Sequence, residues 1–249
     1  MAQLLEVLEF RSWVESAIPI EETSNNAKVV YEKVLATFLT VLSGGERFSN
    51  LSWWSHGIEA IKKGFGVHWL PRASSTLTCF WGNIYTHSLS EKLAGAARQL
   101  ALTIIGWQGI VEDTLTLDSS VLVRYGRQDR ARRGYNPKKR GRPSLHPLLA
   151  FLGSGYGVNV WNRSGDSGAG QSTVSFFHQT RMALGANFHI NRVSCDSGFY
   201  EATFIEYLEH KHLSYIIAVP ISHTIQREIL QVKQWNTITK GVETGEFIF

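Results

Sequence analysis

Residues Thr114 to Pro147 read TLTLDSSVLVRYGRQDRARRGYNPKKRGRPSLHP. Apolar residues alternate with polar ones through Leu115, Leu117, Val121 and Val123, and this period of two predicts a β-strand. One carboxylate, Asp118, interrupts the apolar pattern. Aspartate is disfavoured inside strands, and a buried unpaired carboxylate is costly. Asp118 is therefore either a cap at the end of the strand or a functional group, and the residues alone leave both interpretations open.

A dense block of positive charge follows the strand. Between Arg124 and Arg142 lie nine of the chain's 25 Lys and Arg residues and one of its 21 acidic residues, so this block carries +8 and the remainder of the chain −4. Such local charge is typical of a surface that binds a polyanion. The alternative is a solvated charged face, but residues 134–137 and Pro143 favour turns over a helix. The predicted DNA-binding residues are Arg130, Arg132, Arg133, Lys138, Lys139, Arg140 and Arg142.

Within this block, the segment from Arg140 to Pro143 reads RGRP. It is similar to the core of an AT-hook, an extended segment that places two arginines in a narrow minor groove. The similarity predicts an extended backbone here and DNA binding that weakens as salt rises.

The regions on either side of this block differ in their periodicity. Residues 1–112 have apolar side chains at spacings of three and four, which predicts a helical N-terminal domain. Helices are expected at Val29–Leu42, Gly57–Gly64, Arg72–Ile84 and Leu89–Trp107. Five tryptophans of this region are interpreted as core anchors, or alternatively as exposed platforms for stacking on bases: Trp53, Trp54, Trp69, Trp81 and Trp107.

Residues 113–249 alternate between the two periodicities. Strands are expected at 148–151, 156–162, 189–195 and 214–219, and helices at 171–184 and 200–211. The chain is also expected to start a strand in its last residues, GEFIF. The fold class predicted for this region is α/β, with a mixed sheet covered by helices.

A second aspartate, Asp196, ends the strand at 189–195 and precedes a helix, where it could serve as a helix cap. Alternatively, Asp118 and Asp196 meet at the C-terminal side of one sheet. Two converging carboxylates are suitable ligands for Mg²⁺ or Mn²⁺. A pair of such ions can activate water and stabilise a leaving oxygen in phosphodiester chemistry. The adjacent basic block would then hold the polyanionic substrate.

Composition excludes several classes of protein. No stretch of about 18 uninterrupted apolar residues is present, so no membrane partner is expected. The N-terminus lacks the charge pattern of a signal peptide. Two distant cysteines, Cys79 and Cys195, predict a reduced intracellular protein rather than a zinc site. We therefore expect a cytoplasmic protein.

Three segments together resemble the DDE transposases of bacterial insertion sequences. LDSSVLVRYGRQDRARRGYNPKKRGRPSLHPLLAF resembles the family's first aspartate strand and basic loop, RVSCDSGFY its Asp-Ser-Gly-Phe second aspartate motif, and YIIAVP its next core strand. A fainter likeness covers PRASSTLTCFWGNI. The resemblance implies an RNase H-like sheet in residues 113–249, with Asp118 and Asp196 as catalytic ligands of Mg²⁺ or Mn²⁺. It also implies that residues 1–112 bind the terminal inverted repeats, that the protein cleaves and transfers strands of double-stranded DNA, and that it forms a homodimer on that DNA.

The chain departs from the family at the third acid, a glutamate on a later helix in a Tyr/Arg/Glu/Lys-type motif. The late acids Glu228, Glu243 and Glu246 do not match that pattern. The resemblance therefore implies a catalytic domain truncated before the third acid, with weak or no activity. Two alternatives stay open: a non-catalytic DNA-binding protein derived from a transposase, and a metal-dependent nuclease that uses Glu228 as its third acid.

Overall fold

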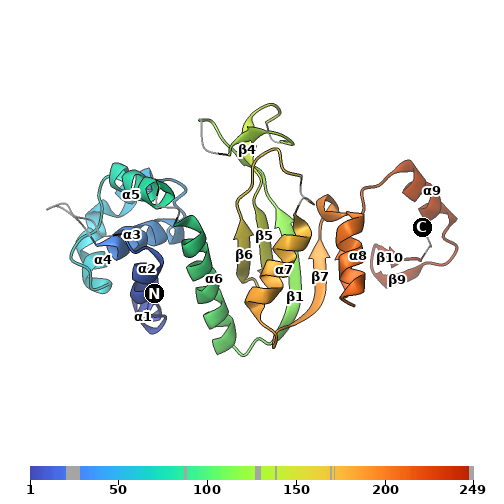
Figure 1. Ribbon diagram of the computed structural model, residues 1–249, viewed down its shortest axis with the longest axis horizontal. Coiled ribbons are helices and arrows are strands. Elements are labelled where there is room, and N and C mark those ends of the chain that lie inside the picture. Colours follow the sequence, from blue (N-terminus) through green and yellow to red (C-terminus); the bar gives the residue numbers. More distant parts are fainter. Residues whose placement is uncertain are drawn as a thin grey trace. The chain divides into compact units, whose positions relative to one another are not determined.

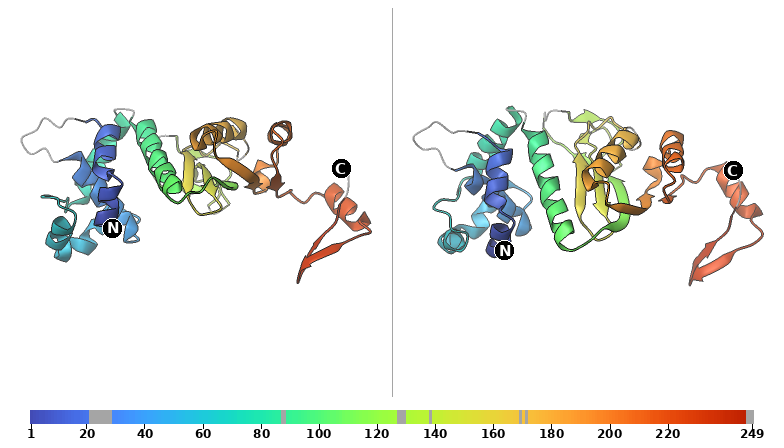
Figure 2. Two further views of the ribbon diagram at one scale, coloured as in Figure 1. Left: turned by 90° about the horizontal axis from the view of Figure 1, so that it is seen from below. Right: turned by 60° about the horizontal axis from the view of Figure 1, so that its bottom comes forward.

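The computed structural model describes residues 1–20, 29–86, 89–126, 130–137, 139–168, 170 and 172–246. The chain divides into two compact units, Met1–Gly109 and Ile110–Phe249. Figures 1 and 2 show the helices of the first unit in blue to green, and the sheet of the second in green to orange.

The first unit is helical in its described residues. Its elements are α1 (Ala2–Val7), α2 (Phe10–Ala17), α3 (Val30–Leu42), the 3-10 helix η1 (Phe48–Gly57), α4 (Ile58–Gly64), α5 (Ser74–Thr86) and α6 (Ser90–Trp107). The four helices expected from apolar spacing correspond to α3, α4, α5 and α6, with boundaries shifted by at most two residues. Apolar residues of these helices form one core, in which Leu35, Ala36 and Leu77 are fully buried.

A buried carboxylate ties the loop before α5 to α3. Glu32 lies in the first turn of α3, and its Oε1 accepts hydrogen bonds from the backbone N–H groups of His68 (3.2 Å) and Trp69 (3.1 Å). Two backbone donors that would otherwise be unpaired are thereby satisfied. Glu32 therefore has a structural role.

The prediction that the five tryptophans are core anchors is wrong for two of them. Trp54 is buried, whereas Trp53 and Trp107 are 58% and 54% exposed. Trp69 and Trp81 are half-buried, and the indole N–H of Trp81 donates to the Thr37 hydroxyl at 3.0 Å. The apolar spacing did not distinguish the two sides of each helix at these positions.

The second unit is built on a five-stranded mixed sheet with the order β6-β5-β1-β7-β8. The strands are β1 (Glu112–Ser119), β5 (Leu148–Leu152), β6 (Gly157–Trp161), β7 (His189–Cys195) and β8 (Tyr215–Ile217). The pairs β6–β5 and β5–β1 are antiparallel, while β1, β7 and β8 are parallel. This is the mixed sheet that the periodicity of the sequence predicted, and the fold class that the family resemblance implied.

Helices α7 (Thr173–Leu184) and α8 (Ala202–His210) pack with the buried face of the sheet (Figure 1). Their phenylalanines Phe176, Phe177 and Phe204 are fully buried. On the sheet side, the alternation that buries Leu115 and Leu117 also buries the paired residues of β5 and β7. Parallel strands joined through helices account for the α/β class.

A second, three-stranded sheet extends β1, and we call it the mini-sheet. Its order is β2-β4-β3, with β2 (Leu122–Val123), β4 (Pro143–Leu145) and β3 (Arg132–Arg133), all antiparallel. Figure 1 shows it projecting beyond the end of the main sheet. The apolar alternation had predicted strand character as far as Val123, a range that includes β2. The basic block after it was predicted as a loop, and that prediction is wrong for β3 and β4, which are too short to produce a recognisable periodicity.

The remaining elements of the second unit, within the described residues, are a 3-10 helix, a further helix and a hairpin. The 3-10 helix η2 (Ser197–Phe199) precedes α8, and α9 (His223–Gln231) leads to the hairpin of β9 (Asn236–Thr239) and β10 (Val242–Thr244). The strand expected in GEFIF falls mostly on residues 247–249, which lie outside the described residues. Within the described part of the chain, no helix has both the length and the apolar content needed to cross a membrane.

Candidate functional site

Asp118 and Asp196 lie at the same end of neighbouring parallel strands. The last paired residues of β1 and β7 are Leu117 and Cys195, and each aspartate directly follows one of them. Adjacent strands are about 4.8 Å apart. Leu117 and Cys195 are 1% and 7% exposed, whereas both aspartates are exposed. Because side chains alternate along a strand, both carboxylates leave the sheet on the side opposite to its buried face.

Each of these aspartates also shapes its own turn. Asp118 Oδ1 accepts a hydrogen bond from the Ser119 N–H at 2.7 Å, and Asp196 Oδ1 accepts one from the Gly198 N–H at 2.9 Å. Asp196 is thus the cap of η2, as the capping interpretation predicted, although the helix is a 3-10 turn before α8. One backbone donor occupies one oxygen of each carboxylate. The capping and ligand interpretations are therefore compatible.

Two exposed carboxylates on adjacent strand ends fit the donor chemistry of a magnesium site. Mg²⁺ prefers oxygen ligands and is often held by one or two carboxylates together with waters and substrate phosphates. Among the described residues, no group of three or more His, Cys, Asp and Glu could hold a metal ion. Glu228, on α9, is therefore not grouped with the two aspartates, and its Oε1 lies 4.0 Å from Arg227 Nε.

The basic residues of the predicted DNA-binding block lie on the mini-sheet and its connecting turns. Those that the structure describes are all exposed: Arg130, Arg132, Arg133, Lys139, Arg140 and Arg142. Lys138 lies outside the described residues. Because β1 continues directly into β2 after Ser119, this charged surface projects from the end of the sheet that carries Asp118.

The backbone around the AT-hook-like segment is a turn, so the prediction of an extended segment is wrong. The Arg142 N–H donates to the Lys139 carbonyl at 3.2 Å, and Gly141 has a φ of 75°. Asn136 is buried and holds both sides of the turn: its Oδ1 accepts from the Lys139 N–H (2.9 Å), and its Nδ2 donates to the Arg142 carbonyl (3.3 Å). Local side-chain bonds of this kind favour turns over extended backbone.

A buried arginine, which sequence reasoning missed, anchors the base of the mini-sheet. Arg163 Nε donates to the His146 carbonyl at 3.1 Å, Arg163 Nη1 donates to the Gly168 carbonyl at 2.8 Å, and the His146 N–H donates to the Arg163 carbonyl at 3.0 Å. Burial lowers the pKa of Arg163. Nothing in its loop-like sequence context signalled this role, because both acceptors are backbone carbonyls.

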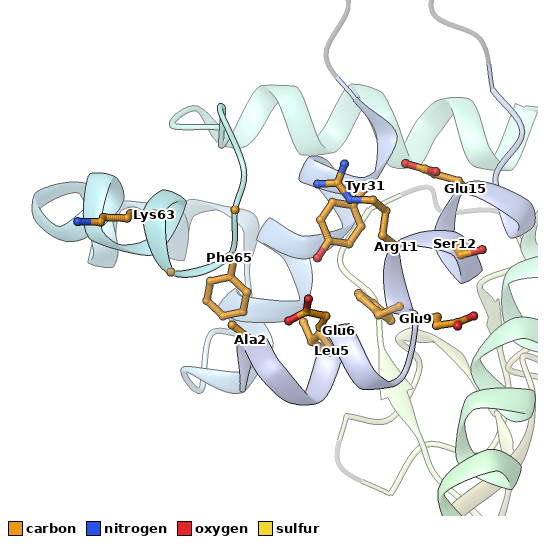
Figure 3. A pocket seen from close by; sticks show the side chains of 13 residues that line it. Ala2, Leu5, Glu6, Glu9, Arg11, Ser12, Glu15, Tyr31, Lys63 and Phe65 are labelled. Carbon is orange, nitrogen blue, oxygen red and sulfur yellow. The ribbon is translucent and has the colours of Figure 1, made fainter.

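The first unit has a pocket of about 650 Å³ between α1, α2, α3 and the end of α4. Figure 3 shows Arg11 beside the ring of Tyr31, with Glu6, Glu9 and Glu15 around them. The guanidinium carbon of Arg11 lies 4.4 Å from the Tyr31 ring centroid. Burial raises the pKa of Tyr31. The negative charge of Glu15 also raises it, and the positive charge of Arg11 lowers it by less than the total of these two effects. We therefore interpret Arg11 and Tyr31, which line the pocket, as structural residues.

No family model matches the sequence, and no curated protein sequence matches it. Among solved structures, the chain is similar to the piggyBac transposase in a synaptic complex with hairpin DNA, with 12% identity, a TM-score of 0.45 and coverage of 92% of this chain and 51% of that one. It is also similar to the Mos1 transposase in a paired-end complex with the left transposon end, with 10% identity, a TM-score of 0.30 and coverage of 86% and 66%. The chain thus spans about half of the first protein's length and about two thirds of the second's. A likeness at this level defines no activity for this chain.

Proposed function

We propose that this chain is part of a DDE-type transposase, which binds the ends of a mobile element and catalyses metal-dependent cleavage and transfer of DNA strands. The observation that carries the proposal is the placement of Asp118 and Asp196 directly after the register pair Leu117 and Cys195. Two carboxylates on one sheet edge, beside a projecting basic surface, combine a metal-binding group with a polyanion-binding one.

In this proposal, Asp118 and Asp196 hold Mg²⁺ or Mn²⁺ through their carboxylate oxygens. When bound, the metal supplies an activated water and stabilises the leaving oxygen. The backbone N–H groups of Ser119 and Gly198 orient the two carboxylates by binding one oxygen of each. Such preorientation lowers the entropy lost when a ligand binds.

The basic residues of the mini-sheet contact the DNA phosphates in this proposal. The turn held by Asn136 presents Lys139, Arg140 and Arg142 on a fixed backbone. The helical first unit would bind the terminal inverted repeats, and the protein would act as a homodimer on double-stranded DNA in the nucleoid.

A second candidate is a DNA-binding protein without catalytic activity. The observation that favours it is that each aspartate already caps a turn of its own backbone. In that case the carboxylates would stabilise the sheet edge, and the mini-sheet alone would carry the function.

Calorimetric titration with Mg²⁺ and with Mn²⁺ separates the two candidates. The transposase proposal predicts binding in the wild type, and a loss of at least about tenfold in affinity for Asp118→Asn and for Asp196→Asn, because each substitution removes one charged ligand. Asp113→Asn, at the other end of β1, is the matched control and should bind like the wild type. Equal binding by all four proteins would contradict the assignment of the metal ligands.

DNA binding is tested separately, because both candidates require it. Replacing Lys139, Arg140 and Arg142 with alanine should weaken binding of duplex DNA and flatten its dependence on salt. The logarithmic slope should change by about 0.9 for each DNA phosphate that these side chains no longer neutralise. An unchanged slope would show that these mini-sheet residues do not contact the DNA phosphates, which both candidate functions require.

A further inference from the structure

Two tyrosines project from the tip of the mini-sheet. Tyr125 follows β2 and Tyr135 follows β3, and they are 67% and 76% exposed. In the antiparallel order β2-β4-β3, the C-terminal ends of β2 and β3 lie beside the start of β4. Both rings are therefore at the same end of the mini-sheet as the turn of residues 139–142.

The backbone that carries Tyr135 is held on both sides. Gly134 packs so closely on the carbonyl of Gly165 that a Cβ atom there would overlap it, and Asn136 is buried with its side chain bonded to the turn. An exposed aromatic ring on a fixed backbone loses little entropy on binding, because only its two side-chain torsions are ordered.

The ring of Tyr125 lies among cations. Lys139 Nζ is 5.0 Å and Arg142 Cζ is 5.7 Å from its centroid. These distances are within the range of cation–π attraction, which keeps the charged groups next to the ring. A polyanion held by Lys139 and Arg142 would consequently have its bases close to Tyr125.

We propose that Tyr125 and Tyr135 stack on unpaired bases, so that this surface prefers DNA with locally separated strands to a perfect duplex. Phosphate contacts need only the cations, and the base faces of an intact duplex are already covered by their neighbours. Positive charge interleaved with exposed aromatic rings is the arrangement that binds single-stranded nucleic acid. This inference rests on the proposed function, in which the mini-sheet contacts DNA, and adds the class of DNA that it recognises.

The test compares three fluorescently labelled probes of the same sequence: a duplex, the duplex with a central mismatched bubble, and one single strand. Binding is followed by anisotropy at one fixed salt concentration. The wild type should bind the bubble and the single strand more tightly than the duplex. Each of Tyr125→Ala and Tyr135→Ala should reduce that preference by roughly tenfold, since stacking on a base has about this effect on affinity. Tyr125→Phe and Tyr135→Phe should retain it, because they keep the ring.

Tyr156→Ala is the matched control, because Tyr156 lies in the β5–β6 turn, where the Leu152 N–H donates to its carbonyl. It should bind all three probes like the wild type. An equal loss on all probes in the two tyrosine-to-alanine variants, or no loss on any, would overturn the stacking proposal. If duplex binding still depends on Lys139, Arg140 and Arg142, the proposed function stands and only the preference for unpaired bases fails. If those three replacements also change nothing, the mini-sheet does not contact DNA, and the part of the proposed function on which this inference rests fails with it.

Discussion

The two ends of β1 carry one aspartate each, and their surroundings are opposite. At the N-terminal end, Asp113 Oδ1 accepts from the Thr114 N–H (2.7 Å) and Oδ2 from the Ser154 N–H (2.8 Å). At the C-terminal end, Asp118 accepts one hydrogen bond, from Ser119, and has an exposed neighbour in Asp196. A carboxylate with both oxygens bonded to backbone has a structural role, whereas one with an oxygen to spare can bind a ligand.

The electrostatics of Asp113 agree with this difference. Burial by itself would raise the pKa of Asp113, but hydrogen bonds from Ser154, Thr114 and Gly153 outweigh it and lower the pKa. Asp113 closes the β5–β6 turn onto the start of β1, where the Gly153 N–H donates to the Thr114 carbonyl at 2.8 Å. The comparison teaches that lying at the end of a strand does not by itself distinguish a structural aspartate from a candidate ligand, and that the hydrogen bonds to its two oxygens do.

The largest expected effect is on the reactivity of the Cys195 thiol, which lies beside the C-terminal end of β1. Burial raises the pKa of Cys195 to about 12, so at neutral pH its thiolate is roughly a thousandfold scarcer than that of a thiol at the reference value. A thiol reagent should label the exposed Cys79 and spare Cys195 in the folded protein. Peptide mapping of the labelled protein measures this. Comparable labelling of both would show that the Leu117 and Cys195 pair is open, and would remove the register that places the two aspartates together.

The next largest effect concerns the packing of Gly165 against the mini-sheet, beyond the C-terminal end of β1. A Cβ atom on Gly165 would overlap the carbonyl oxygens of Ser144 and Arg132. Gly165→Ala should therefore lower the free energy of unfolding by about 3 kcal/mol, measured by urea denaturation. Gly168→Ala is the control, because a Cβ there meets nothing within 4 Å, and its effect should stay within about 0.5 kcal/mol. Equal effects of the two variants would argue against this packing.

The comparison of the two aspartates is tested directly by stability. Asp113→Ala removes the acceptor of two backbone N–H groups and should cost about 1.5 kcal/mol of unfolding free energy, since the site is partly exposed. Asp118→Ala removes one local hydrogen bond at an exposed position and should cost about 0.5 kcal/mol. Urea denaturation at neutral pH gives both values. A larger cost for Asp118→Ala than for Asp113→Ala would contradict the structural role assigned to Asp113 and the ligand role proposed for Asp118.

The smallest expected effect is the pH dependence of the Asp113 contribution. Because the folded-state pKa of Asp113 is lowered, its stabilisation is fully present above the ordinary carboxyl pKa of about 3.9 and is lost as the pH falls through the folded-state value. The stability difference between the wild type and Asp113→Ala should accordingly be constant above about pH 5 and shrink below about pH 4. Urea midpoints across this range measure it. A difference that grows as the pH falls would contradict the lowered pKa.

Much of the second unit could be predicted from its sequence. The alternation around Leu115 and Leu117 identified β1, and residues 189–195 were predicted as a strand with the boundaries that β7 has. These predictions succeeded because each strand has a buried face, which imposes a period of two on the sequence. β3 and β4 have two and three residues, and a strand of that length contains too few alternations to be recognised.

The site was predictable only in part. Asp118 stood out as a carboxylate inside a strand, although it lies on the polar side of the alternation, and the basic block stood out by its charge. Asp113 did not stand out, because its partner Ser154 is 41 positions away in the chain. The conformation of residues 139–142 depended on Asn136, whose amide reaches both sides of the turn. The sequence predicted turns from residues 134–137 and Pro143, but not that the Asn136 side chain would bond to this turn.

The sequence by itself determined the classes of the elements, the concentration of positive charge after β1, and the two aspartates at strand ends, because periodicity, charge and residue type are local properties. Tertiary structure alone decided that β1 and β7 are parallel neighbours in a register that ends at Leu117 and Cys195. It also decided that Arg163 anchors the mini-sheet through backbone carbonyls. Strand pairing and carbonyl acceptors involve backbone groups that every residue has, so no side-chain pattern in the sequence specifies which of them meet.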